Sequence, residues 1–513
     1  MHGVTASEIG AGLARWLRNH QEPDGRIRDP LHGDTGTYAA GLAALAFRLM
    51  QRQTGDASWM DACRRSAEFA LRRPRTSEFD TFALLLLADD TQADDPGLSR
   101  KILRTVRPFH GRRLVSNNWI AMRAASTSLY ARLTASPSHA ALAQMLWRRV
   151  IGRQREDGLF NDAPAGEGAP VTYHAKFCAM LALEYAAHPD ADLQSALKRG
   201  LETLYALVTP SGALVPYGRS RNTLFGHAAA AYALAAGGAL FGDGRFQGAA
   251  ARILRRIKSF QHDDGHVPAV LNAGEAARED WDVYVNNPDY NAYAAALLLM
   301  AREAHLPTDA DEPPAPPEPQ VCQVGPIVTV RDAYTFAAFV GRGECAPFGT
   351  PFFCDHRTWA LQPLWIEQKG RVLLEPEPYT WKGEGDRSAL VDPACNRWMP
   401  YVEAGGLRYA MLTCNRIEVR LTEGTVQMEG SGPLTALLPV PRWKRALGSI
   451  LFLLTGRPYA VFHMRSLPQA SLRKHLRWNP VSGCAAVAAS VHGELPQGAR
   501  MQQLQQEIRL AYA

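Results

Sequence analysis

The five-residue phrase Gln-x-x-Asp-Gly occurs three times in the first 300 residues of this chain of 513 residues. It occupies residues 21–25, 154–158 and 261–265, each time after an amphipathic run and before a short extended stretch. Asp-Gly favours tight turns, and its recurrence at one place in a helix–turn unit indicates repeated architecture. Repeated helical hairpins that each bury one face can close into a ring around a central cavity.

Apolar residues spaced at i, i+3, i+4 and i+7 predict twelve helices before residue 305. The predicted segments are 5–20, 36–52, 57–73, 78–90, 97–108, 117–134, 137–152, 171–187, 190–208, 221–240, 244–260 and 287–304. One member of most pairs is rich in alanine, glycine and large apolar residues, which is typical of helices buried on all sides. Its partner carries polar residues along one side. Six such inner and outer pairs predict an (α/α)6 toroid over residues 1–305.

A segment rich in proline and acidic residues, 306–320, ends the helical pattern and is predicted to be a semi-rigid linker. From residue 321 to 513 the periodicity is two, which predicts an antiparallel β-sandwich domain. The predicted strands are 327–332, 334–340, 359–367, 371–374, 408–412, 417–421, 459–463 and 485–491. The apolar run 446–455 is interpreted as a buried strand. A helix over 441–456 and contact with a membrane surface are its alternatives.

The composition excludes several classes of protein. A net charge of +6 is small for this length, so nucleic acid is not an expected partner. The eight cysteines lack CxxC spacing, and neither a phosphate-binding loop nor a metal-ligand motif occurs, so no cofactor is expected. No apolar run is long enough for a membrane span.

Two further features of the composition leave alternatives open. Only eight of the 56 basic residues are lysines, which reflects either genome composition or the use of arginine to bind carboxylates or sulfates. The N-terminus lacks the layout of a signal peptide, so the protein is expected to be cytoplasmic or to be a chain from which a leader was removed.

The predicted ring suggests where the chemistry lies. All inner helices of such a ring start on the same side, so the residues at their N-termini converge on one mouth of the cavity. The polar and aromatic residues at these positions are His32, Asp34, Tyr38, Glu78, Asp80, Asn117, Asn118, Trp119, Tyr173, His174, Arg219, Arg221, Asn222, His227, Tyr284, Asn286, Asn287, Asp289, Tyr290 and Asn291. Six positive helix ends directed at one cleft favour an anionic ligand.

Three short motifs resemble the (α/α)6-toroid polysaccharide lyases of the heparinase II/III and alginate-lyase-like group. Residues 157–160 with 171–178 resemble its DG-x-F…YH segment, residues 116–119 its asparagine-containing helix start, and residues 217–221 its YGR-type turn. The chain departs from this pattern in two places: the acidic residue that often precedes YH is absent, and the spacer before Tyr173 is glycine-rich. The resemblance implies the toroid, the β-sandwich and cleavage of an acidic polysaccharide by β-elimination at a uronate.

This chemistry needs a group that neutralises the uronate carboxylate, a base for the C5 proton and an acid for the departing oxygen. The predicted catalytic residues are Tyr173, His174, Asn118, Arg221 and Tyr284. The predicted substrate-binding residues are Asn117, Trp119, Arg219, His227, Tyr290, Asn287, His356 and Arg357, the last two on a loop of the β domain. Each has a structural alternative: Asn117 as a helix cap, the Tyr173–His174 pair in packing, and His227 in the core.

Two other functions fit the same cleft. A glycoside hydrolase would use a pair of carboxylates from Glu78, Asp80, Asp157, Asp264 and Asp282. A binding or epimerising protein of exopolysaccharide metabolism would share the abstraction of the C5 proton without cleaving the chain. The products distinguish the three functions.

Overall fold

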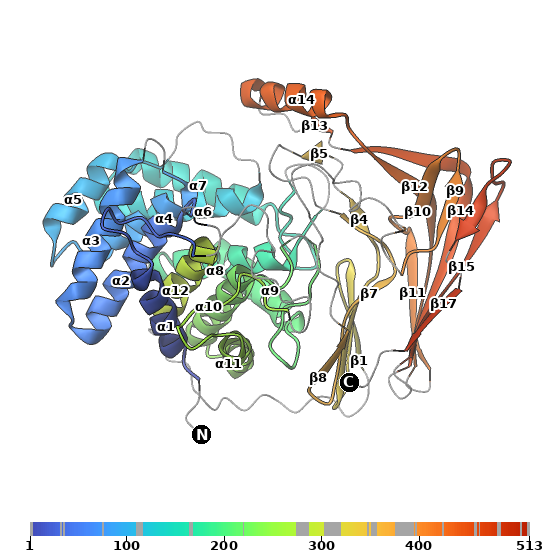
Figure 1. Ribbon diagram of the computed structural model, residues 1–513, viewed down its shortest axis with the longest axis horizontal. Helices are drawn as coiled ribbons and strands as arrows, with labels where there is room; N and C mark the ends of the chain where they lie inside the picture. Colours follow the sequence, from blue (N-terminus) through green and yellow to red (C-terminus); the bar gives the residue numbers. More distant parts are fainter. Residues whose placement is uncertain are drawn as a thin grey trace.

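The computed structural model describes residues 4–30, 33, 36–73, 76–108, 116–163, 168–218, 220–272, 287–301, 320–345, 348–349, 357–374, 394, 398–422, 425–455, 459–460, 462–479, 484–502 and 505–509. Within this part of the chain, twelve helices precede residue 302, and antiparallel sheets follow residue 319 (Figure 1). The helices are α1 (Ala6–Asn19), α2 (Ala39–Thr54), α3 (Ala57–Arg72), α4 (Glu78–Asp90), α5 (Pro96–Thr105), α6 (Asn117–Thr134), α7 (Pro137–Ile151), α8 (Val171–Ala187), α9 (Ala191–Ala206), α10 (Leu224–Phe241), α11 (Gly244–Ser259) and α12 (Asn287–Ala301).

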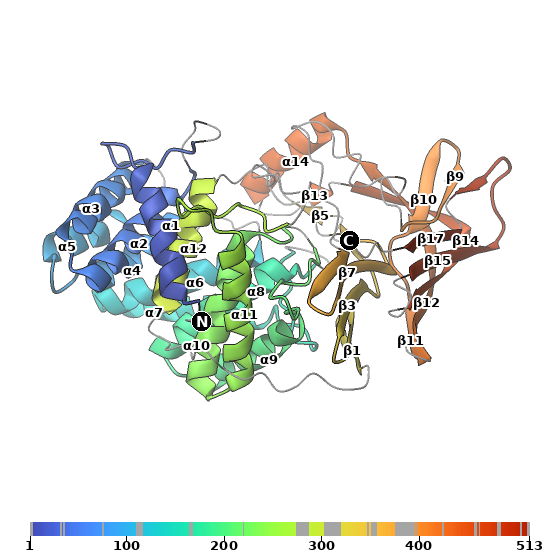
Figure 2. The same cartoon turned by 60° about the horizontal axis from the view of Figure 1, so that its bottom comes forward.

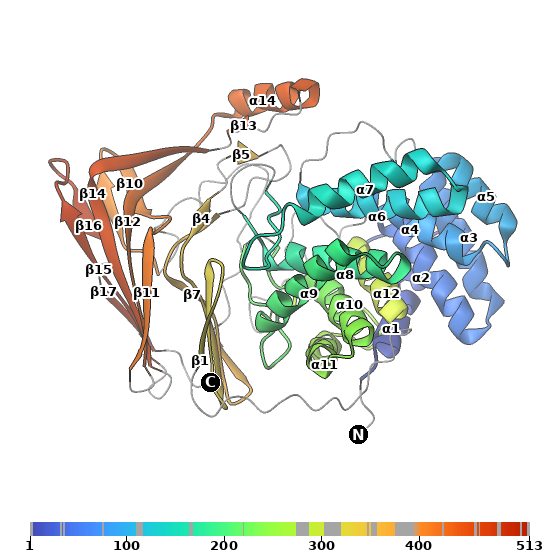
Figure 3. The same cartoon turned by 180° about the vertical axis from the view of Figure 1, so that it is seen from behind.

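Six helices contact one another in a closed cycle, which runs α2, α4, α6, α8, α10, α12 and back to α2. We call these the inner helices. They are apolar on nearly all sides, which is typical of helices without a solvent face. The outer helices α3, α5, α7, α9, α11 and α1 pack against α2, α4, α6, α8, α10 and α12 respectively (Figure 3).

The repeated turns join neighbouring outer helices. In each Gln-x-x-Asp-Gly turn the glycine has a left-handed φ, and the glutamine side chain donates a hydrogen bond to a backbone carbonyl of another outer helix. The three bonds are Gln21 to Ala62 in α3 (2.8 Å), Gln154 to Ala196 in α9 (2.9 Å) and Gln261 to Ile9 in α1 (3.2 Å). Because Gln261 reaches α1, the last turn connects the end of the outer layer to its beginning.

A fourth turn at residues 208–212 has the same backbone hydrogen bonds but lacks the glutamine and the aspartate. Thr209 donates its N–H to Ala213, and Gly212 donates to Thr209, as the equivalent residues do in the other three turns. The added Cβ of an alanine at Gly212 would lie 2.2 Å from the Arg252 carbonyl oxygen in α11. The close approach of the turn to the next outer helix is therefore the shared property, and it requires only the glycine.

The described residues after 319 form antiparallel sheets and one helix. A five-stranded sheet has the order β1-β2-β3-β7-β8, and an eight-stranded sheet has the order β16-β9-β10-β12-β14-β15-β17, with β11 beside β12. Two small sheets pair β4 with β6 and β5 with β13. The elements are β1 (Gln320–Val324), β2 (Ile327–Arg331), β3 (Thr335–Val340), β4 (Glu344–Cys345), β5 (Phe348–Gly349), β6 (Arg357–Thr358), β7 (Gln362–Gln368), β8 (Arg371–Leu374), β9 (Tyr401–Ala404), β10 (Leu407–Met411), β11 (Arg416–Thr422), β12 (Thr425–Pro439), α14 (Arg442–Thr455), β13 (Tyr459–Ala460), β14 (Phe462–Asn479), β15 (Cys484–Gly493), β16 (Arg500–Gln502) and β17 (Gln505–Arg509).

The five-stranded sheet lies between the helices and the larger sheet (Figure 2). Its side chains alternate between two cores, as the period of a strand requires. Phe336 and Trp365 belong to the core of the helical part. Their neighbours Ala337 and Ile366 belong to the core shared with the eight-stranded sheet. The sheet therefore anchors the β region to the helices.

Most of the expected elements are present. The ends of all twelve helices lie within three residues of the predicted ends, and every predicted strand overlaps a described strand. The apolar run 446–455 is an exception, because it lies in the helix α14, so the expectation of a buried strand was wrong and the helical alternative is confirmed. The predicted linker lies outside the described residues except for Gln320, which begins β1.

One helix in the described part of the chain is long and apolar enough to cross a membrane. It is α10, the inner helix Leu224–Phe241, and 78% of its apolar window is buried inside the molecule. A core helix of the ring satisfies the same criterion, so α10 is weak evidence for a span.

Candidate functional site

The N-termini of the six inner helices meet at one end of the ring. Contacts between residues of the first two turns run around the whole cycle: Asp289 of α12 accepts the N–H of Tyr38 before α2, and Asp80 of α4 accepts that of Gly41 in α2. Glu78 of α4 pairs with Arg123 of α6. The remaining contacts join Asn118 to Lys176, Tyr173 to Phe225, and Phe225 to Tyr290. This arrangement confirms that these ends converge.

The interior at this end is filled by aromatic rings. Phe79 of α4 and Phe225 of α10 lie at the centre, 6.1 Å apart between ring centroids. Around them are Tyr38, Trp119, Tyr173, Tyr290 and Tyr293, whose centroids lie 4.1 to 6.4 Å from one of the two phenylalanines. We call these seven residues the central aromatic cluster. It brings together Trp119, Tyr173 and Tyr290 of the predicted site residues.

A buried lysine lies against this cluster. Lys176 is fully buried in α8, and its Nζ lies 4.3 Å from the centre of the Phe79 ring, within the range of a cation–π interaction. Its Nζ donates a hydrogen bond of 2.9 Å to Oδ1 of Asn118. The Asn118 amide nitrogen donates in turn to Asp162 at 2.7 Å and to Ser116. Asn118 therefore positions a buried cation, and its amide is already engaged inside the protein.

Tyr173 borders a loop with an unusual backbone. The Tyr173 and Ser220 hydroxyl oxygens are 3.1 Å apart. Ser220 and Asn222 have φ values of 55° and 54°, in the left-handed region that non-glycine residues rarely adopt. Such conformations cluster at functional sites. Arg221 lies between these two residues and is partly exposed.

His174, one of the predicted catalytic residues, lies where its ring is not available for proton transfer. It is fully buried, its Nε2 lies 3.0 Å from the Gly200 carbonyl in α9, and its Nδ1 accepts the N–H of Phe160 at 3.3 Å. Burial lowers the pKa of His174 to about 4. Because both ring nitrogens are engaged by backbone groups and the ring faces the turn before α8, the expectation of proton transfer is replaced by a structural role.

His227 has the same role one repeat later. Its Nε2 accepts the N–H of Leu214 at 3.3 Å, and burial lowers its pKa to about 3. In α12 the equivalent position is Asn291, whose Oδ1 accepts the N–H of Val267 at 3.1 Å. In α8, α10 and α12, one side chain near the start of the helix therefore accepts a hydrogen bond from the extended residue that follows the preceding turn. The structural alternative for His227 fits this geometry, and substrate binding does not.

The remaining predicted residues are buried at helix starts, lie in the β region or lie outside the described part of the chain. Asn117 is buried and donates to the Asn161 and Ala163 carbonyls, so it holds the loop before α8. Asn287 is buried at the start of α12. Arg357 lies in β6 opposite Cys345 of β4. The residues outside the described part of the chain are His32, Asp34, Arg219, Asp282, Tyr284, Asn286 and His356.

The β region reaches this end of the ring through β4. Glu344 of β4 pairs with Arg155 and accepts the N–H of Ala169, in the loop that precedes α8. Because β6 pairs with β4, Arg357 lies one strand away from this contact. The expectation that Arg357 lies on a loop was wrong, because Arg357 lies in the short strand β6.

The carboxylates considered for hydrolysis are engaged in structural contacts. Glu78 forms a buried ion pair with Arg123 at 2.7 Å. Asp80 is fully buried and accepts hydrogen bonds from Gly41 and Ser77. Asp157 and Asp264 accept backbone N–H groups within their own turns. None of these four leaves a carboxylate pair open toward the aromatic cluster.

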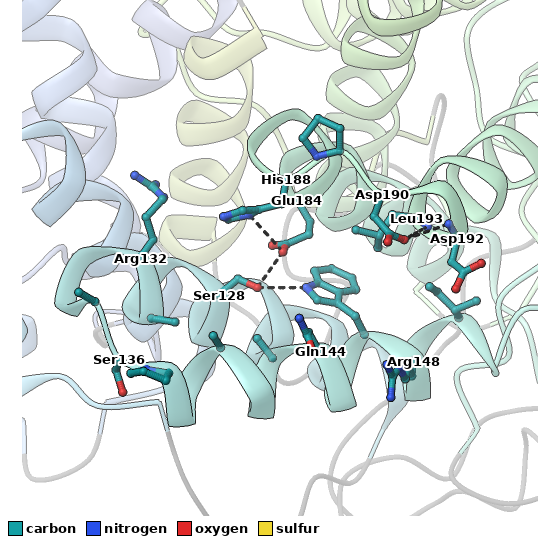
Figure 4. Close-up of a pocket in the computed structure, with 18 residues that line it drawn as sticks. Ser128, Arg132, Ser136, Gln144, Arg148, Glu184, His188, Asp190, Asp192 and Leu193 are labelled. Carbon is teal, nitrogen blue, oxygen red and sulfur yellow. Dashed lines mark hydrogen bonds and ion pairs between the residues drawn. The ribbon is translucent and has the colours of Figure 1, made fainter.

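A groove of about 620 Å³ lies at the other end of the helices, between the C-termini of α6 and α8 and the N-termini of α7 and α9 (Figure 4). Ser128 donates to Glu184 at 2.8 Å, and Trp147 Nε1 donates to Ser128 at 3.3 Å. Burial raises the pKa of Glu184, and Nδ1 of His188 lies 3.4 Å from its carboxylate. None of the predicted site residues lines this groove.

Lys176 and Ser220 were missed by the sequence analysis. Lys176 is one of only eight lysines and stands three residues after Tyr173 in a largely apolar helix. This spacing places both residues on one face of the helix and was an available signal. Ser220 lies inside a motif that was noted, but nothing in the sequence marks its left-handed backbone.

Comparison with known proteins gives structural matches only. No family model matches the sequence, and neither does any curated protein. The solved structures that match include a glycosyl hydrolase of family 88 from Bacteroides vulgatus, with 12% identity, a TM-score of 0.45 and coverage of 58% of this chain and 99% of that chain. An α-1,6-mannanase from Salegentibacter has 12% identity, a TM-score of 0.47 and coverage of 58% and 100%. A polysaccharide lyase has 13% identity, a TM-score of 0.44 and coverage of 58% and 98%.

Proposed function

We propose that this protein is a carbohydrate-active enzyme that cleaves a uronate-containing polysaccharide or oligosaccharide by β-elimination. In this proposal residues 1–305 form an (α/α)6 toroid with the cleft at the N-terminal end of its inner helices, and residues 321–513 form a β-sandwich beside it. The observation that carries the proposal is the Tyr173 hydroxyl, which lies 3.1 Å from the Ser220 hydroxyl on a left-handed loop.

The electrostatics of this end suit an acidic sugar. The C5 proton of a uronate becomes removable when the charge of the neighbouring carboxylate is neutralised. The positive ends of six helices, the buried Lys176 ammonium and the Arg221 guanidinium all favour a carboxylate here. Trp119, which is partly exposed, offers an aromatic face to a sugar ring.

In this proposal Tyr173, one of the predicted catalytic residues, is the base. Its oxygen, in the deprotonated phenolate form, accepts the C5 proton, the electrons of the C5–H bond form a C4–C5 double bond, and the C4–O4 bond breaks with its electron pair on O4. Tyr173 then gives this proton to the departing O4, which regenerates the phenolate, and the products are an unsaturated uronate and a chain with a new hydroxyl. No step requires a metal or a nucleotide.

One observation favours hydrolysis as a second candidate. Burial raises the pKa of Asp289 to about 7, and the nearby Asp80 adds to the effect. A carboxyl that is protonated near neutrality is what a glycosidase needs as its general acid. However, Asp289 is fully buried, and its two oxygens accept the N–H groups of Thr37 and Tyr38 at 2.9 Å. This engagement makes β-elimination the better supported reaction.

The test is an ultraviolet assay with a panel of uronate polymers, including bacterial exopolysaccharides. The wild-type protein is expected to release unsaturated products, and Tyr173→Phe, which removes only the hydroxyl, is expected to lower the rate by about 10²–10⁴. Tyr293→Phe is the matched control. Its hydroxyl belongs to the same cluster but is fully buried, without a hydrogen-bond partner among the described residues.

Other outcomes point elsewhere. Full activity of Tyr173→Phe would show that a different residue transfers the proton. Saturated products that disappear in Asp80→Asn would establish the hydrolase. Exchange of the C5 proton without chain scission would establish an epimerase.

A further inference from the structure

Five large apolar side chains of helix α14 are turned to solvent. Trp443, Leu447, Ile450, Leu451 and Leu454 are between 48% and 69% exposed. At 3.6 residues per turn, these five positions lie within an arc of about 100°, so they form one continuous band, which we call the apolar stripe. Apolar surface of this extent is unusual on a monomer and indicates an interaction site.

The surroundings of α14 leave the stripe open. Figure 1 shows the helix at the edge of the molecule, beyond the strands β5 and β13, and Figure 3 shows the same from behind. Among the described elements, α14 packs against β13, the short strand that follows it. The burial of Gly448, which lies outside the stripe, is consistent with contact on that side.

The charge of the region indicates what the stripe meets. Residues 430–493 contain no aspartate or glutamate. The basic residues of the same segment are Arg442, Lys444, Arg445, Arg457, Arg465, Arg473, Lys474 and Arg477. Three of them stand in the first turn of α14, where the Lys444 Nζ lies 5.3 Å from the centre of the Trp443 ring. The helix thus combines an apolar stripe, a tryptophan and a basic end without any carboxylate.

We propose that α14 binds the surface of an anionic lipid bilayer. The apolar stripe enters the boundary between headgroups and acyl chains, Trp443 lies at headgroup level, and Lys444 and its neighbours contact the lipid phosphates. With 14 residues α14 is too short to span a bilayer, so it lies in the plane of the membrane. A second copy of the chain is a poorer occupant, because contact between two copies of this region would bring basic segments together without a carboxylate to pair with them.

The test uses the full chain and two kinds of vesicle, one of phosphatidylcholine alone and one of equal parts phosphatidylcholine and phosphatidylglycerol. We expect the protein to float with the anionic vesicles, and rising salt is expected to weaken binding. The double variant Leu447→Gln, Leu451→Gln is expected to bind at least about tenfold more weakly, because it removes two large apolar side chains from the bilayer. Lys444→Glu is expected to reduce binding to the anionic vesicles.

The control is Met145→Gln, which removes an exposed apolar side chain from α7 and should leave binding unchanged. Circular dichroism checks that every variant is folded. Failure of the wild-type protein to bind anionic vesicles overturns the proposal, and so does equal binding by the double variant. Dimerisation that the same double variant abolishes, seen by light scattering without vesicle binding, would instead assign the apolar stripe to a second copy.

Discussion

One step along α8 separates a side chain that faces the ring from one that faces the turn. Tyr173 reaches the central aromatic cluster, whereas His174 bonds to Phe160 and Gly200 on the outer side. Consecutive residues of a helix point about 100° apart, and here one of the two faces the central aromatic cluster while the other does not. Nothing in the Tyr-His pair itself says which one does, and this is why the predicted site contained a structural histidine.

The buried histidines give the first stability prediction. Because burial lowers the pKa of His174 to about 4 and that of His227 to about 3, both rings stay neutral in the folded protein while the unfolded chain takes up protons below about pH 6.5. The contribution of the neutral histidines to the free energy of unfolding is fully present above pH 6.5 and is lost as the pH falls toward their lowered pKa values. Each histidine contributes a slope of up to about 1.4 kcal/mol per pH unit.

Asparagine is the informative replacement, because Asn291 makes the equivalent contact in α12. His174→Asn and His227→Asn keep an acceptor for the backbone N–H but remove the titration. Urea unfolding at several pH values should show a smaller loss of stability below pH 6.5 in the variants. The pKa of Asp289, raised to about 7, acts in the opposite direction and is common to all the proteins compared. An unchanged pH slope would contradict the assignment.

At the scale of elements, the helices were predictable and the long strands were not. The inner and outer helices repeat one pattern of period 3.6, with caps such as Thr5 and Ser77 at their starts. By contrast, β14 contains Pro468 and many basic residues, and its partner β12 carries Pro433 beside a shift in register. Strand pairing between distant segments decides such elements, and local periodicity does not reveal it.

The repeated turns give a prediction at this scale. Gly25 and Gly55 both have left-handed backbones, with φ values of 92° and 73°. A Cβ at Gly25 would lie 2.0 Å from the Arg65 carbonyl oxygen in α3, whereas a Cβ at Gly55 meets nothing within 4 Å. Gly55→Ala should therefore cost about 1 kcal/mol, as backbone strain alone requires.

Gly25→Ala should cost clearly more, because the turn must also move away from α3. The difference between the two free energies of unfolding, measured in urea, isolates the contact between turn and helix. Equal losses in both variants would show that the turn does not hold the outer helices together.

At the scale of the whole molecule, the helices and the β region share one core across the five-stranded sheet. Trp365 of β7 is fully buried on the side that faces the helices, with the Arg256 guanidinium 5.2 Å from the centre of its ring. Two residues later in the same strand, Glu367 accepts a hydrogen bond of 2.7 Å from Ser211, which lies in the turn at residues 208–212. The sequence predicted two parts of different periodicity but not the contact that joins them.

This contact gives the last prediction. Trp365→Ala removes the largest side chain between the two parts and should lower the free energy of unfolding by about 3–5 kcal/mol. Since the rest of the helical core and the core shared with the eight-stranded sheet remain, we expect calorimetry to show the helical and β parts unfolding in separate transitions at different temperatures. Tyr334→Ala is the control, because Tyr334 is exposed at the turn between β2 and β3 and should change neither the transition nor its temperature. A Trp365→Ala protein that unfolds like the wild type would show that the sheet is not what couples the two parts.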